Sequence, residues 1–186
     1  MPLSSNERAG LGMFESWHDF YLVLGPASAG LIGLLFVVMS LTVGLERGRV
    51  LRGAKVYMTP IVFHLAVLVL LCGLTLFPKV GGFFIGAVAT ACGLIGLAYA
   101  TYICRAFLGK TVESYEGDLW FYGVAVGVLY AGMAASGVLV LARHPAGPYV
   151  LAADQLALFL LMLNNAWDLV VFITPRKDDP PDQAGT

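Results

Sequence analysis

The chain has 186 residues, of which 59% are hydrophobic and only 12% charged, and its mean hydropathy is +0.81. Soluble domains carry about 25% charged residues, so this composition excludes a water-soluble protein. Eleven Lys and Arg residues face twelve Asp and Glu residues, which leaves no basic excess for binding nucleic acid. Three cysteines, an odd number within apolar runs, argue against a disulfide framework.

Five apolar segments follow one another along the chain, and each approaches the roughly 20 residues needed to cross a bilayer. They cover residues 20–44, 60–77, 83–104, 119–142 and 149–174. Pro60 is expected in the first turn of the second helix, and Pro26 predicts a kink near Gly25, with Ser28 or a neighbour bonding the freed carbonyl. The sequence therefore predicts an all-α polytopic membrane protein with five transmembrane helices in one domain, residues 1–175.

The sequence also predicts the structure of the two ends of the chain. Residues 7–19 place Leu11, Phe14 and Trp17 on one side, which favours a short interfacial amphipathic helix, although an ordinary aromatic belt accounts for the aromatic residues equally well. Residues 176–186 are expected to form a disordered cytoplasmic tail.

The loop charges predict how the chain is oriented. When loops are assigned alternately to the two sides, eight Lys and Arg residues fall on one side and three on the other. The positive-inside rule then places the N-terminus outside and the C-terminus in the cytoplasm. We expect a multi-pass protein of the inner, or plasma, membrane.

Small residues recur at helical spacing on two segments and indicate close helix packing, because lipid supplies no hydrophobic drive for helix association. The two sets are Gly123, Gly127, Ala131 and Ala135 on the fourth segment, and Gly86, Ala89, Gly93, Gly96 and Ala100 on the third. These faces either pack within the chain or mediate self-association.

The fifth segment carries polar residues that are costly in a membrane. Asp154, Asn164, Asn165 and Asp168 fall on one stripe about 120° wide. This stripe is expected to face protein, water or a ligand rather than lipid tails. It is either a polar pathway or binding site, or a set of interhelical hydrogen bonds with Asp154 and Gln155 at the outer interface.

His64 and Asp168 are expected at similar depth, because both lie one to two turns inside the cytoplasmic ends of their helices. A carboxylate beside a histidine favours the protonated imidazole, as a proton relay or pH gate requires. Ser40, Tyr99 and Tyr102 are expected near the same level. The alternative is that His64 simply bonds a backbone carbonyl.

A divalent metal site on the outer side is a further hypothesis. Glu15, His18 and Asp19 are within one helical turn, with His144 on the same side of the membrane, although such interfacial residues are mostly solvated. The sequence contains no P-loop, HExxH or GxSxG motif, so it indicates neither an enzyme class nor a cofactor.

Together these patterns predict a homo-oligomeric channel or transporter-like protein that passes or binds a small polar solute or cation along the fifth helix. The alternative is a non-catalytic accessory or regulatory subunit of a larger membrane complex. A third interpretation, an intramembrane enzyme or cofactor carrier built on His64, Asp168 and the tyrosines, has no motif to support it.

Overall fold

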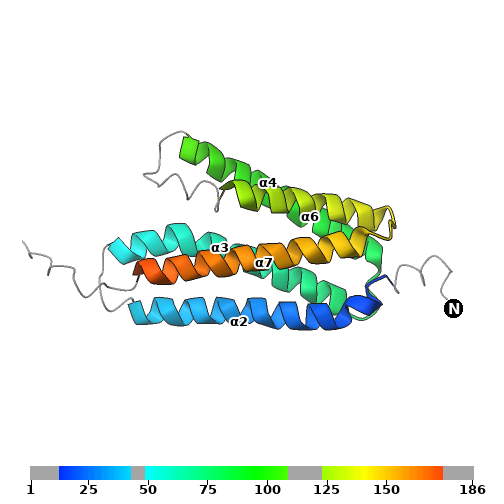
Figure 1. Cartoon of the computed structure of the whole chain (residues 1–186), viewed down its shortest axis with the longest axis horizontal. Coiled ribbons are helices and arrows are strands. Elements are labelled where there is room, and N and C mark those ends of the chain that lie inside the picture. The colour runs from blue at the N-terminus through cyan, green and yellow to red at the C-terminus, as the bar shows by residue number, and fades with distance from the viewer. Residues whose placement is uncertain (1–12, 43–48, 109–122, 174–186) are drawn as a thin grey trace, which may run out of the picture.

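The computed structural model describes residues 13–42, 49–108 and 123–173, which form helices and turns and no strand (Figure 1). In chain order the elements are η1 (Glu15–Trp17), α2 (His18–Thr42), α3 (Arg49–Leu76), α4 (Gly82–Leu108), α6 (Ala125–Leu141) and α7 (Gly147–Ile173). The predicted all-α architecture of a polytopic membrane protein is confirmed.

Four of the described helices are long and apolar enough to cross a membrane: Glu15–Ser40, Met58–Leu76, Gly82–Arg105 and Gly147–Val171. The fifth, α6, is a shorter apolar helix of 17 residues. At 1.5 Å per residue α6 is about 26 Å long, close to the thickness of the hydrocarbon core. The predicted fourth segment began at residue 119, and its first residues lie outside the described part of the chain.

The helices run up and down along the long axis of the molecule, so α2 begins at one end and α7 finishes at the other (Figure 1). Two helix pairs make up most of the bundle: α2 packs against α3, and α4 packs against α6. Helix α7 joins these pairs by contacting α6, α3 and α2. The α4–α6 pair diverges from the other helices toward the end where α7 finishes (Figure 1).

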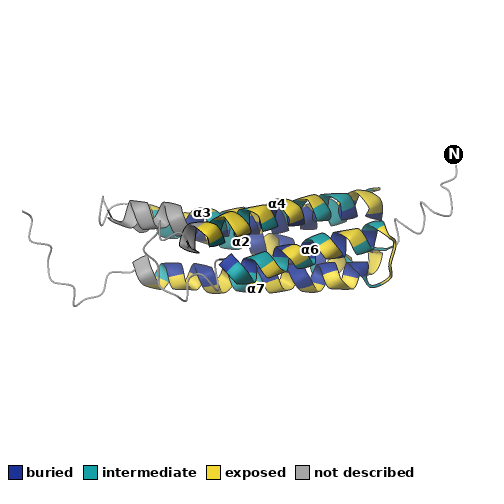
Figure 2. Ribbon diagram, turned by 90° about the horizontal axis from the view of Figure 1, so that it is seen from above, coloured by how far each residue is buried: buried dark blue, intermediate teal, exposed yellow. Residues whose placement is uncertain are grey.

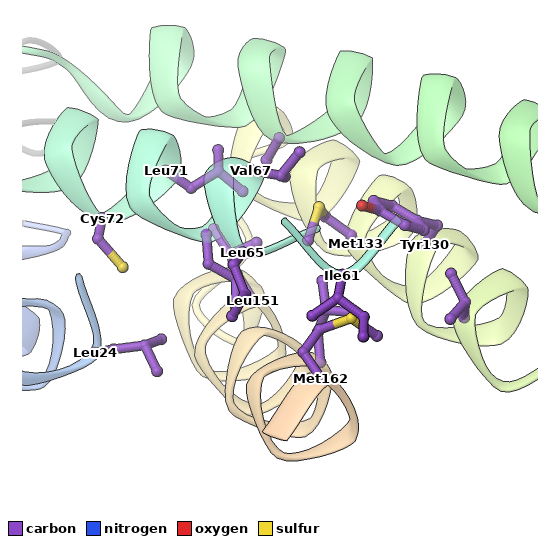
Figure 3. Packing of buried hydrophobic residues seen from close by; sticks show 14 of the residues in the cluster. Leu24, Ile61, Leu65, Val67, Leu71, Cys72, Tyr130, Met133, Leu151 and Met162 are labelled. Carbon is purple, nitrogen blue, oxygen red and sulfur yellow. The ribbon is translucent and has the colours of Figure 1, made fainter. Parts of the chain in front are cut away.

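Buried residues line the contacts between helices and exposed residues face outward, as Figure 2 shows. Figure 3 shows Ile61 and Leu65 of α3 beside Leu151 and Met162 of α7, all of them buried. The outward surface is also apolar, with Val23 and Phe83 among its most exposed large side chains. An apolar exterior over an apolar core is typical of helices solvated by lipid.

One proline prediction is wrong, and for the other only the bond from Ser28 to the freed carbonyl is excluded. Helix α3 begins at Arg49 and contains Pro60 in its interior, rather than beginning there. The apolar run marks where the chain enters lipid, and the helix itself begins before that run. The helix continues through Pro60 because a proline removes only one backbone hydrogen-bond donor. In α2, which includes Pro26, the Ser28 hydroxyl donates to the Leu24 carbonyl at 2.8 Å, whereas proline frees the carbonyl four residues before it, that of Leu22.

At the N-terminal end, the described residues form a 3-10 turn that leads directly into α2. The proposed amphipathic helix lies partly in residues 7–12, outside the described part of the chain, as does the tail at residues 176–186. The Trp17 ring packs edge-on against Tyr149 of α7, with centroids 4.9 Å apart. Aromatic side chains of both helices therefore gather at this end of the bundle.

Helices α4 and α6 approach each other so closely that a side chain at several of their glycine positions would clash with the opposite helix. A Cβ atom at Gly93 would overlap the backbone of Ala134, and one at Gly86 would lie 2.9 Å from the Gly137 carbonyl oxygen. Ala100 lies 3.5 Å from the position of a Cβ atom at Gly127. The predicted small-residue faces therefore pack within the chain at these positions. Ala131 and Ala135 are exposed, and self-association through them stays a prediction.

Replacing Gly93 by Ala should force α4 away from α6 and lower the free energy of unfolding by about 1 to 3 kcal/mol, the usual cost of overpacking. Thermal unfolding in detergent measures the effect. The control is Gly30→Ala on α2, because a Cβ atom there meets nothing within 4 Å. Equal melting temperatures for the two variants would contradict this account of the α4–α6 contact.

Candidate functional site

Asp154 of α7 is an acidic side chain buried inside the bundle. It lies about 10 Å along α7 from Gly147, inside the candidate span, and is only 9% exposed. Neighbouring helices therefore cover this side chain, and its depth in the membrane stays a prediction. Its Oδ2 atom is buried without a hydrogen-bond partner. A carboxylate in this state is costly until a proton, a cation or a polar group satisfies it.

Gly132 of α6 makes the space that Asp154 occupies. A Cβ atom at this glycine would lie 2.5 Å from the Oδ1 atom of Asp154. The carboxylate is therefore held against bare backbone in the contact between α6 and α7. Gly132 was not predicted as a site residue, because it lies outside the fourfold series on the same helix.

His64 and Tyr130 form a buried polar pair across the bundle. The Tyr130 hydroxyl lies 2.6 Å from the Nδ1 atom of His64, and which group donates depends on the tautomer of the ring. Over the described residues, no Cα atom of α3 lies within 8 Å of one in α6, so this bond spans helices whose backbones do not touch. The expectation of a bond from His64 to a backbone carbonyl is not what the structure describes.

Glycine also positions the Tyr130 ring. A Cβ atom at Gly96 of α4 would overlap this ring, so the ring fills the place of a side chain on α4. Figure 3 shows Tyr130 next to Met133 in the core contributed by α6. Sequence analysis missed Tyr130, because a tyrosine among small apolar residues gives no signal until its partner is known.

Tyr99 of α4 completes an aromatic group around His64. Its ring centroid is 6.0 Å from that of His64 and 5.9 Å from that of Phe63. The Tyr130 centroid is 5.3 Å from His64. Tyr99 was expected near His64 and lies there, whereas Tyr102 is 68% exposed. Ser40 is also exposed and donates to the Phe36 carbonyl at 2.8 Å.

Gln155 and Asn165 are fully buried polar side chains on α7. Both amide atoms of Gln155 lack a hydrogen-bond partner. Gln155 leaves the helix about 100° away from Asp154, while Asn165 lies within about 20° of the Asp154 direction. The buried polar residues of α7 therefore point in more than one direction around the helix.

The predicted stripe on α7 is buried only in part. Asn164 and Asp168 are exposed on the outside of the bundle, and the Asn164 amide donates to the Asp168 carboxylate at 3.1 Å. Asp168 is thus paired with Asn164, and His64 with Tyr130. The expected His64–Asp168 pair is not formed in the described structure, because equal depth on two helices does not place their side chains on facing sides.

The residues proposed for a metal site lie at the end of the bundle where α2 and α7 begin (Figure 1). The His18 and Asp19 side chains are 4.0 Å apart, and Glu15 is exposed beside them. The Nδ1 atom of His144 accepts a hydrogen bond from the Ala146 backbone amide at 3.2 Å. Among the residues that the structure describes, no three His, Cys, Asp or Glu side chains are grouped to hold a metal.

Comparisons of this chain with protein-family models, with curated proteins and with solved structures give no match. The chemistry of the buried side chains is therefore the basis for a functional proposal.

Proposed function

We propose that the protein is a small channel or transporter-like membrane protein that binds and passes a small cation through the interior of its bundle. The observation that supports this most is the buried Asp154 carboxylate, with one oxygen unpartnered and the other held against Gly132. Within hydrocarbon, ionisable side chains of this kind mark ion or proton pathways. The negative charge of Asp154 favours a cationic species over an anion or a neutral solute.

The proposed route lies inside one chain and not along the whole predicted stripe of α7. Asp154 belongs to the interior, whereas Asp168 faces outward. Self-association through the exposed face of α6 is compatible with this route and is not needed for it. An interior route requires only the contacts among α3, α4, α6 and α7.

Asp154→Asn should reduce cation flux by at least about tenfold, because it removes the charge that attracts the cation while keeping the shape of the side chain. The measurement is flux into liposomes that contain the full chain, driven by gradients of protons, Na⁺ or K⁺. Asp168→Asn is the matched control on the same helix and should leave flux unchanged. A parent protein that carries no cation under any gradient would contradict the proposal.

Gly132→Ala tests the same site from the opposite helix. The added methyl group would meet the Asp154 carboxylate, so we expect flux to fall by about tenfold through displacement of this side chain. Gly127→Ala on the same helix makes only an ordinary contact with Ala100 and should retain flux. If both variants transport as the parent does, the placement of Asp154 against Gly132 has no functional role.

A second candidate function is supported by the outward face of α7. Asn164, Asp168 and the 67% exposed Trp167 lie together there, and two of them are polar within the candidate span. A partner helix with hydrogen-bonding groups would cover these atoms, as the interpretation as an accessory subunit requires.

If α7 docks a partner, the particle extracted from membranes of the source organism should be heavier than the protein assembled alone in another host. Asp168→Ala should then reduce the native particle to the lighter mass, because the variant removes the hydrogen-bonding group at the interface. Val171→Ala, on an exposed apolar position nearby, is the control. Equal masses for all native-membrane samples would count against docking through Asp168.

A further inference from the structure

We infer that the cation carried is the proton, and that Tyr130 and His64 relay it from Asp154. This inference rests on the proposed function and specifies its substrate. It assigns a role to Tyr130, whose hydroxyl contacts His64 and whose ring lies in the space left by Gly96.

The surroundings of Asp154 suit a proton better than a metal ion. Divalent cations take six or more oxygen ligands or a compact set of His and carboxylate groups. Among the described residues no such group of three ionisable ligands exists, and Gln155 leaves α7 in another direction. A proton needs one oxygen lone pair, and the Oδ2 atom of Asp154 offers it.

Tyr130 and His64 both accept and donate protons. Asp154 is held against Gly132, which is two residues from Tyr130 on α6, and the Tyr130 hydroxyl is 2.6 Å from His64 Nδ1. Tyr99 of α4 also lies beside this pair, with its ring centroid 6.0 Å from that of His64. Hydroxyl and imidazole groups in hydrogen-bonding contact are the usual components of proton relays.

The relay occupies the middle part of the bundle. Asp154 is about 10 Å from Gly147, where α7 begins, and His64 is about 9 Å from Met58, where the candidate span of α3 begins. Helices α3 and α7 begin at opposite ends of the molecule (Figure 1). Asp154 therefore lies nearer one end of the bundle, and His64, with Tyr130 bonded to it, lies nearer the other (Figure 1).

In the proposed transfer, protonated Asp154 passes its proton through a bridging water to the Tyr130 oxygen. At the same time the Tyr130 O–H proton moves to Nδ1 of His64. The products are the Asp154 carboxylate, a neutral Tyr130 and a His64 imidazolium, so charge and protons balance. The imidazolium then releases a proton from Nε2 toward the opposite face.

Tyr130→Phe tests the relay, because it removes the hydroxyl and keeps the ring that packs on Gly96. We expect proton flux into liposomes, followed with an internal pH dye under a clamped potential, to fall on the order of a hundredfold, the size of effect that a positioned proton-transfer group has. Tyr102→Phe is the matched control: it removes a hydroxyl from an exposed tyrosine of α4, and should retain flux.

Thermal unfolding of both variants and flux through His64→Gln separate a relay from a purely structural role. Comparable melting temperatures with flux lost in Tyr130→Phe and in His64→Gln would support the relay. Should Tyr130→Phe unfold, the flux of His64→Gln decides. Undiminished proton flux in a folded Tyr130→Phe or His64→Gln overturns the relay.

Sodium flux, measured on the parent protein, separates failure of this inference from failure of the proposed function. We expect proton flux without Na⁺ flux. A parent that carries Na⁺ and no protons would overturn the proton assignment and leave cation transport standing. A parent that carries neither ion would overturn both.

Discussion

The close approach of α4 to α6 is the contact on which the interior site depends. Glycines on both helices let the backbones touch, and one of them, Gly96, leaves its side-chain space to the ring of Tyr130. The ring is thereby fixed with its hydroxyl at His64, on a helix whose backbone does not reach α6. A side chain at position 96 would displace the ring and break the one described bond between α3 and α6.

A bilayer has no water to solvate polar groups, so each polar residue of α7 needs a protein partner or a place near the membrane surface. Asp154 and Asp168 differ by only about 40° in direction around the helix. Asp154 is buried against Gly132, whereas Asp168 is exposed. The α4–α6 pair diverges from α7 toward the Asp168 end (Figure 1), so one face of the helix is covered at one level and open at another.

The sequence was sufficient to locate the helices, because an apolar run long enough to cross a bilayer can form all of its backbone hydrogen bonds in lipid only as a helix. It misplaced the start of α3, since the apolar run reports lipid contact and the helix begins at Arg49. For the site, the helical wheel grouped Asp154 with Asp168 correctly by angle but contained no information on which neighbour covers each level. Pairing His64 with Asp168 used depth alone, and depth fixes one coordinate of three. Tyr130, whose hydroxyl contacts His64, could be identified as the partner of His64 only from the packing of α6 beside α4.

Glycine has two distinct roles in this bundle, and they impose different constraints on the site. Gly93 and Gly86 let backbones approach each other, so their replacement acts on the whole α4–α6 contact. Gly96 and Gly132 instead admit a polar side chain from a neighbouring helix, Tyr130 in one case and Asp154 in the other. Because the second pair makes room for two buried polar side chains of the interior, the geometry of the site depends on positions that have no functional group of their own.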